Sequence, residues 1–180
     1  MLIACTLLIG IGASAHACEP VTFASHRFSA EQSSGWQVDI ENALTLTFPT
    51  LPTRIEKLGN LLSVRFADGS VAGLTTRTID ELSAFGEAAN DGVPAFWRRV
   101  FTAGEAIACE VSASMRLAEQ DYRIRFSSHG FDVYAFGTNR RHEFYAIARS
   151  ADGNVIHGIF TDMPRARFET ILSTVTTQDE

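Results

Sequence analysis

Apolar and polar residues alternate most clearly in the last third of the chain. Four short segments there are separated by turns that contain glycine, and each has the alternation or the apolar character of a β-strand. They are DYRIRFSS (121–128), FDVYAFG (131–137), EFYAIARS (143–150) and NVIHGIF (154–160). The middle segments are apolar on both faces, so they need cover from both sides. The pattern therefore predicts a four-strand antiparallel meander inside a layered fold.

A second region of alternation lies in the first half of the chain, in GWQVDIENALTLTFPTLP (35–52). Its apolar positions change phase near Glu41–Asn42. The phase change predicts either a hairpin of two strands or a single strand with a bulge. Pro49 and Pro52 follow, and they end the strand because proline cannot donate to a sheet ladder.

Two Asp-Gly pairs mark expected hairpin turns, since Asp-Gly between alternating segments is the strongest short hairpin signal. Asp68–Gly69 lies within SVRFADGSVAGLTT (63–76), and Asp152–Gly153 lies within IARSADGNVIHGIFTD (147–162). A two-residue loop at the second pair places His157 opposite Ala148 and His142 near Met163. This register separates the two histidines and disfavours a dihistidine metal site on the hairpin.

Helical periodicity marks three other segments. TIDELSAFGEAAN (78–90) opens with the spacing of a capping box. DGVPAFWRRVFTAG (91–104) carries an aromatic stripe typical of a core-facing helix, and DMPRARFETILSTVTTQDE (162–180) carries a shorter apolar stripe. Residues 105–119 fit a helix or a strand equally well. The predicted fold class is α+β, with the antiparallel sheet flanked by helices as in an α-β-α sandwich.

The order of elements in the last third resembles that of a known family. A meander that ends in GNVIHGIFTDMPRARFETILSTV (153–175) is similar to the closing strand and helix of the PsbP/Mog1-like proteins. Many of those are small exported bacterial proteins. The resemblance covers about residues 122–176 and rests on element order. It implies an α-β-α sandwich and a binding or assembly role, and it carries over no catalytic residue.

The chain begins with an apolar run typical of a secretory signal peptide. Residues 2–13 are apolar or small, and two overlapping A-x-A patterns predict cleavage after Ala15 or Ala17. We expect residues 1–17 to be removed and residues 18–180 to form a single domain in the periplasm or outside the cell. No later segment has the roughly 18 consecutive apolar residues of a transmembrane helix.

Two cysteines remain after that cleavage, Cys18 and Cys109. An even count in an oxidising compartment favours a disulfide between them, worth about 4–5 kcal/mol in the chain-entropy model. A second possibility is acylation of Cys18 as the first residue of a lipoprotein, which would tether the protein to a membrane. The typical lipobox leucine is replaced by Ala15, however. The third possibility is two free thiols.

Composition and motifs narrow the function classes. The net charge of −6 argues against a nucleic-acid binder, which normally carries a basic excess. The sequence contains no G-x-S-x-G, P-loop, G-x-G-x-x-G, H-E-x-x-H or C-x-x-C motif. We therefore expect no cofactor, no metal and no recognisable catalytic residue.

The candidate partner-binding residues are cationic. Arg98 and Arg99 lie in a predicted helix, and Arg140, Arg141 and His142 lie in the loop GTNRRHE (137–143). Guanidinium groups bind carboxylates and phosphates in a fixed fork geometry, so these residues suit an acidic partner. The leading hypothesis is a small exported binding module that contacts another protein, as an immunity or inhibitor protein or an envelope-assembly factor. The alternative is a small periplasmic hydrolase with a non-local catalytic site.

Overall fold

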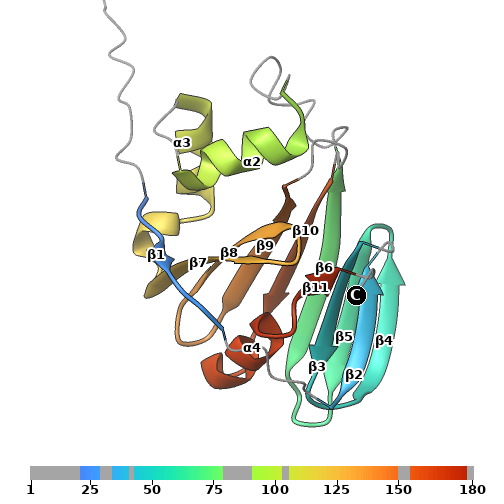
Figure 1. Ribbon diagram of the computed structural model, residues 1–180. Helices are drawn as coiled ribbons and strands as arrows, with labels where there is room; N and C mark the ends of the chain where they lie inside the picture. The colour runs from blue at the N-terminus through green and yellow to red at the C-terminus, as the bar shows by residue number, and fades with distance from the viewer. Residues whose placement is uncertain are drawn as a thin grey trace, which may run out of the picture.

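The computed structural model describes residues 21–28, 34–40, 43–78, 91–102, 106–149 and 155–177. The predicted signal peptide, Cys18 and residues 79–90 of the helix predicted over 78–90 lie outside the described residues, while Thr78 ends β6. The described residues form an α+β fold in which a large sheet is covered on both faces (Figure 1). The predicted fold class is thus confirmed.

The large sheet has eight strands in the order β1-β7-β8-β9-β10-β6-β5-β4. All neighbours are antiparallel except the short β1, which runs parallel to β7. The predicted meander is confirmed as β7 to β10. The strands are β1 (Ala24–Ser25), β4 (Pro52–Leu58), β5 (Leu61–Phe66), β6 (Val71–Thr78), β7 (Tyr122–Ser128), β8 (Phe131–Gly137), β9 (His142–Ala148) and β10 (Val155–Thr161).

A small sheet and one helix cover one face of the large sheet. The small sheet contains β2 (Trp36–Ile40), β3 (Leu44–Phe48) and β11 (Thr176–Thr177), in the order β11-β3-β2. Because β2 and β3 pair antiparallel, the phase change between them is a hairpin and not a bulge. Their apolar residues share one core with the large sheet and with α4 (Arg165–Leu172), where Phe168 is fully buried.

Two helices cover the opposite face, α2 (Val93–Thr102) and α3 (Ala106–Ser114), followed by a short 3₁₀ turn, η2 (Leu117–Glu119). Trp97 stacks on Tyr145, and Phe101 stacks on Tyr134. The aromatic stripe of α2 is therefore core, as predicted. Residues 106–114 form a helix and residues 117–119 a 3₁₀ turn, which decides in favour of helix between the two structures that the sequence of this segment fits equally well.

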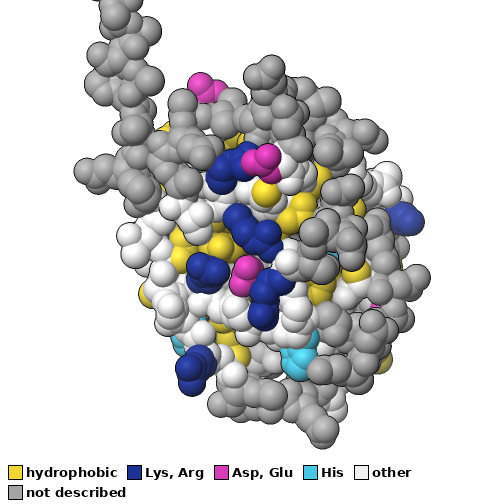
Figure 2. All heavy atoms as spheres, turned by 45° about the horizontal axis from the view of Figure 1, so that its top comes forward, with side chains coloured by type: hydrophobic (Ala, Val, Ile, Leu, Met, Phe, Trp, Pro, Cys, Tyr) yellow, Lys and Arg dark blue, Asp and Glu magenta, His cyan; other side chains and the backbone are white. Residues whose placement is uncertain are grey.

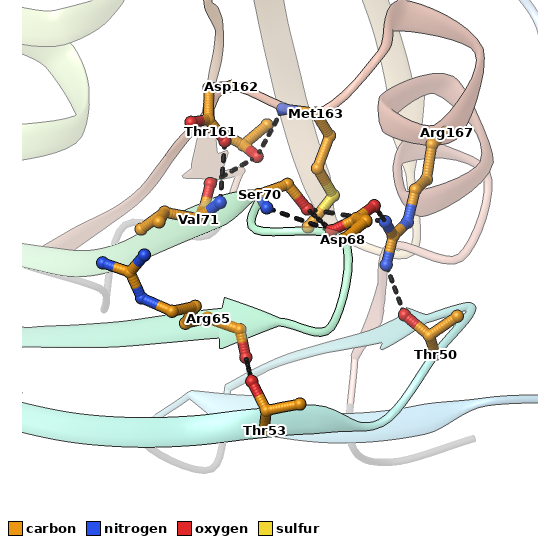
Figure 3. A network of polar contacts seen from close by, with 10 residues as sticks. All are labelled: Thr50, Thr53, Arg65, Asp68, Ser70, Val71, Thr161, Asp162, Met163 and Arg167. Atoms are coloured by element: carbon orange, nitrogen blue, oxygen red, sulfur yellow. Dashed lines mark hydrogen bonds and ion pairs between the residues drawn. The ribbon is translucent and has the colours of Figure 1, made fainter.

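Polar contacts tie the β5–β6 turn to α4 (Figure 3). Arg167 donates to Asp68 at 2.5 Å and to the hydroxyl of Thr50. Asp68 also accepts from the backbone N and the hydroxyl of Ser70, and these bonds lower the pKa of its carboxyl. The turn at Asp68–Gly69 is the predicted hairpin, with a three-residue loop and Gly69 at φ 85°.

The register of the β9–β10 hairpin differs from the prediction. His157 lies opposite Ala146 and not Ala148, whereas His142 lies opposite Thr161 and close to the backbone of Met163, as predicted. The predicted register assumed a two-residue loop at Asp152–Gly153, and the observed pairs are shifted from that register by two positions on β9. The two histidines are still separated by about 13 Å along the strand direction, because His157 lies four residues before Thr161, the residue opposite His142.

Candidate functional site

The three candidate residues between the end of β8 and the start of β9 lie in different environments. Arg140 and Arg141 are exposed, but His142 is fully buried. The His142 ring stacks on Phe168, and its Nδ1 lies 2.9 Å from the hydroxyl oxygen of Tyr122. Burial lowers the pKa of His142. The structure therefore does not bring His142 to a partner-binding surface with Arg140 and Arg141.

The two arginines of α2 also point to different neighbours. Arg99 forms an ion pair with Asp91, with 2.7 Å between Nη1 and Oδ2. Arg98 instead reaches Asp132 on β8, with 3.5 Å between Nε and Oδ2. Asp132 lies at the start of β8, whereas the turn that carries Arg140 follows the end of the same strand. The predicted cationic residues therefore do not form one surface.

Arg98 is part of a different basic site. Arg125 of β7 and Arg149, which follows β9, also approach Asp132, with N–O distances of 3.6 Å and 3.9 Å. We call Arg98, Arg125, Arg149 and Asp132 the arginine cluster. The face of the molecule in Figure 2 shows basic side chains gathered near its middle with an acidic side chain among them.

Strand alternation places the cluster on the helix-covered face of the sheet. Residues 122, 124 and 126 of β7 point into the core shared with α4, so Arg125 points to the opposite face. Asp132 and Tyr134 of β8 lie on that same face, because Arg125 is opposite Tyr134 in the register. Arg149 directly follows β9 and lies four residues after Tyr145, so strand alternation places it on the same face as Tyr145.

Contacts to the backbone and to an aromatic ring hold the guanidinium groups in place. Arg98 donates from Nη2 to the carbonyl of Ala148 at 2.5 Å. The Arg125 guanidinium lies 5.3 Å from the centre of the Tyr134 ring, which is within the range of a cation–π contact. Tyr134 itself is buried, and burial raises the pKa of its hydroxyl. The cluster is therefore anchored in the core on one side.

The charges of the cluster are unequal. Asp132 is largely buried, with 11% of its side chain exposed, and it also accepts a hydrogen bond from Ser127 at 3.1 Å. The three arginine side chains are 33–49% exposed. Three guanidinium groups around one carboxylate leave a local surplus of two positive charges on an acidic protein. The distances to Asp132 are longer than those of bidentate pairs, so donors remain free to bind another anion.

An open cavity of about 920 Å³ lies beside the cluster. It lies between the β1 segment, the end of β7 and the end of α4, and Arg125 and Ser127 connect it to the cluster. Its lining also includes two histidines and a further arginine, namely His26, His129 and Arg27. The surface around Arg125 is thus hollowed and mostly basic or neutral.

Sequence reasoning missed Arg125, Arg149 and Asp132 as site residues. One signal for part of the site was present, because His129–Gly130 forms a two-residue turn with both φ angles positive. That turn fixes Ser127 opposite Asp132 and brings Arg125 close to it. The approach of Arg98 and Arg149 depends on how α2 packs and where β9 ends, which local sequence does not reveal.

The remaining candidates have structural partners or lie outside the described residues. His157 is buried, and its Nδ1 lies 3.2 Å from the Thr76 hydroxyl. Cys109 lies on α3 with 7% exposure, and the Cys18–Cys109 disulfide stays a prediction because Cys18 is not among the described residues. Within the described ranges, no three His, Cys, Asp or Glu side chains come close enough to hold a metal.

None of the helices in the described part of the chain is long and apolar enough to cross a membrane. No protein-family model matches the sequence, and no curated protein matches it.

Proposed function

We propose that this protein is a small exported binding module that recognises an acidic group of a partner protein through the arginine cluster. The observation that carries the proposal is the convergence of three guanidinium groups, from α2, β7 and the end of β9, on the single carboxylate of Asp132. The proposal keeps the predicted class of function but moves the site. Of the predicted residues, only Arg98 belongs to the cluster.

The physical basis is preorganisation. The core contacts of Arg98 and Arg125 fix their guanidinium groups before any partner arrives, which reduces the side-chain entropy lost on binding. Asp132 keeps the three positive charges together at a distance that leaves N–H groups available. An incoming carboxylate would gain charge-assisted hydrogen bonds and would neutralise the surplus charge.

An acidic protein segment fits this site better than a nucleic acid does. The whole chain carries a net charge of −6, so the positive surface is local and repulsion would oppose a long polyanion. In the exported setting that the N-terminal run predicts, immunity proteins, inhibitors and assembly factors all act by such contacts. A toxic effector encoded beside this protein would favour the first two roles.

The test is a titration of the mature chain with a hexaglutamate peptide, followed by NMR of backbone and arginine side-chain resonances. We expect saturable shifts centred on Arg98, Arg125 and Arg149, with an affinity that falls as salt is added. Replacing Arg125 and Arg149 by Gln should weaken the peptide affinity by about tenfold or more, because two charge-assisted contacts are lost.

The matched control is the double variant Arg140→Gln/Arg141→Gln, which removes the same charge from the exposed β8–β9 turn. We expect it to bind the peptide within about twofold of the parent. If the two double variants weaken binding equally, only net charge matters and the proposal fails. Loss of binding in the control alone would move the site back to the loop.

A further inference from the structure

The edge strand β4 is unlike the rest of the described surface. It is the last strand of the large sheet, and every residue after Pro52 in it is exposed. The exposed large hydrophobic residues of the described part of the chain all lie in or beside it, namely Leu51 (73%), Ile55 (50%) and Leu58 (66%). A long, exposed, apolar edge strand is a template for pairing with another strand.

The hairpin geometry shows which backbone groups face outward. β4 and β5 are joined by the two-residue loop Gly59–Asn60, which Leu58 and Leu61 flank as directly opposed residues. Such a loop is closed by a hydrogen-bonded pair, and the pairs then alternate along an antiparallel ladder. The backbones of Arg54, Glu56 and Leu58 therefore face β5, and those of Ile55 and Lys57 face away from the sheet.

An antiparallel partner strand must match outward groups with outward groups, which limits the registers for two identical strands. A register is centred on a residue when that residue lies opposite the same residue of the second copy. Registers centred on Arg54, Glu56 or Lys57 therefore place two like charges directly opposite each other. The register centred on Ile55 places Arg54 opposite Glu56 of the second copy, and Glu56 opposite Arg54 of the second copy. This register pairs opposite charges twice and joins the two Ile55 side chains, and both kinds of cross-strand pair are stabilising.

We propose that β4 pairs with β4 of a second copy of this chain, antiparallel and centred on Ile55, to form a symmetric dimer with one continuous sheet. The occupant is a second copy because the strand is complementary to itself in charge. Within one chain, Arg54 and Glu56 already form an ion pair, so their side chains share one face and are placed to meet the second pair.

The two-fold symmetry makes the contact closed, so it yields a dimer and not a fibre. Pro52 limits its length: Thr53 to Lys57 can pair, and a register irregularity between Pro52 and Arg54 bends the strand before that. A contact of this length is smaller than a standard interface, so the dimer should be reversible and its population should rise with concentration. The inference does not depend on the arginine cluster, which lies near the other end of the strand order.

Sedimentation equilibrium of the mature chain, in dilution series, tests the dimer. Arg54→Glu and Glu56→Arg each place like charges opposite across the two-fold axis. We expect either single change to raise the dimer dissociation constant by about tenfold or more, since two attractive pairs become repulsive. The double variant Arg54→Glu/Glu56→Arg should restore it, and an equimolar mixture of the two single variants should form a heterodimer.

Arg140→Glu serves as the control, because it makes the same charge change on the β8–β9 turn, outside β4, and should leave the dissociation constant unchanged. The register is tested separately by oxidising Ile55→Cys and Lys57→Cys chains: the first should form a covalent dimer faster, because only residue 55 faces itself. A parent chain that stays monomeric at high concentration overturns the inference. If neither charge reversal changes the dimer dissociation constant, or if both cysteine variants form covalent dimers at the same rate, the proposed interface is wrong.

Discussion

His157 and His142 lie on the same face of adjacent strands, and burial determines the chemistry of both. Each ring has one neutral hydroxyl partner, Thr76 for His157 and Tyr122 for His142. Neither hydroxyl compensates a positive charge on the ring, so burial lowers both pKa values. The charge of Arg165 lowers the pKa of His142 further, against smaller opposing effects of the Met163 backbone and Glu169. His157 is therefore a core residue with a hydrogen-bond partner.

The first prediction concerns pH. Burial lowers the pKa of His157 from 6.5 to about 4, so between these values the unfolded chain binds a proton that the folded chain does not. The free energy of unfolding should therefore fall as the pH drops from about 6.5 toward 4. His157 alone should contribute about 2 kcal/mol of loss between pH 7 and pH 5.

Urea unfolding at both pH values checks this prediction. In His157→Gln, the drop between pH 7 and pH 5 should shrink by about 2 kcal/mol, and a residual drop from His142 should remain. His26→Gln, the same change at an exposed histidine, is the matched control for the substitution itself. An equal drop in the parent and in His157→Gln would contradict the assignment.

At the scale of elements, the turns decide the register of the meander, and glycine is required at one close approach. Gly137 ends β8 opposite His142, at the base of the turn that carries Arg140 and Arg141. A Cβ atom there would lie 2.4 Å from the backbone oxygen of Arg141. Thr138 N donates to the same carbonyl at 2.8 Å, so the oxygen has little room to move.

The second prediction is that Gly137→Ala lowers the free energy of unfolding by about 1–3 kcal/mol, because the backbone must shift to admit the methyl group. Chemical denaturation measures this change. Arg140→Ala, in the same turn but exposed, should change the stability by less than about 0.5 kcal/mol. A neutral Gly137→Ala would mean that this turn is wider than described.

At the scale of the whole molecule, the sheet draws its cover from distant parts of the chain. α4 and the β2–β3 hairpin share a core on one face, and α2 and α3 form a second core on the other. Cys109 lies on α3, in the helical layer, and is buried with 7% exposure. A disulfide from Cys109 to Cys18 would fix the start of the mature chain to this helical layer.

The third prediction follows from that proposed link. Cys109→Ser should lower the stability of the oxidised protein by a few kcal/mol, up to the roughly 4–5 kcal/mol expected for a loop of this length. The parent should approach the same stability when reduced. The intact mass of the exported chain, measured with and without reductant, is an independent test. Reduction of a disulfide adds two hydrogens to the mass, whereas acylation of Cys18 raises the mass under both conditions.

The sequence by itself determined the α+β class, the meander of β7 to β10, the aromatic core face of α2 and the hairpin at Asp68–Gly69. These features depend on periodicity and turn chemistry, which act between residues close in the chain. The β4 strand escaped prediction because all its residues after Pro52 are exposed and so carry no alternation of burial. The β9–β10 register was wrong because an Asp-Gly pair does not by itself fix which residues of the two strands lie opposite each other.

Only the tertiary structure decided which charged residues meet. Arg98, Arg125 and Arg149 are far apart in the chain, and they converge on Asp132 because α2 packs across the strands that carry the others. Arg140 and Arg141 are adjacent to His142 in sequence, yet burial of His142 separates it from them. Local sequence patterns predict which side of an element a residue occupies. Its neighbours on that side depend on contacts between elements, and these form only when the whole chain folds.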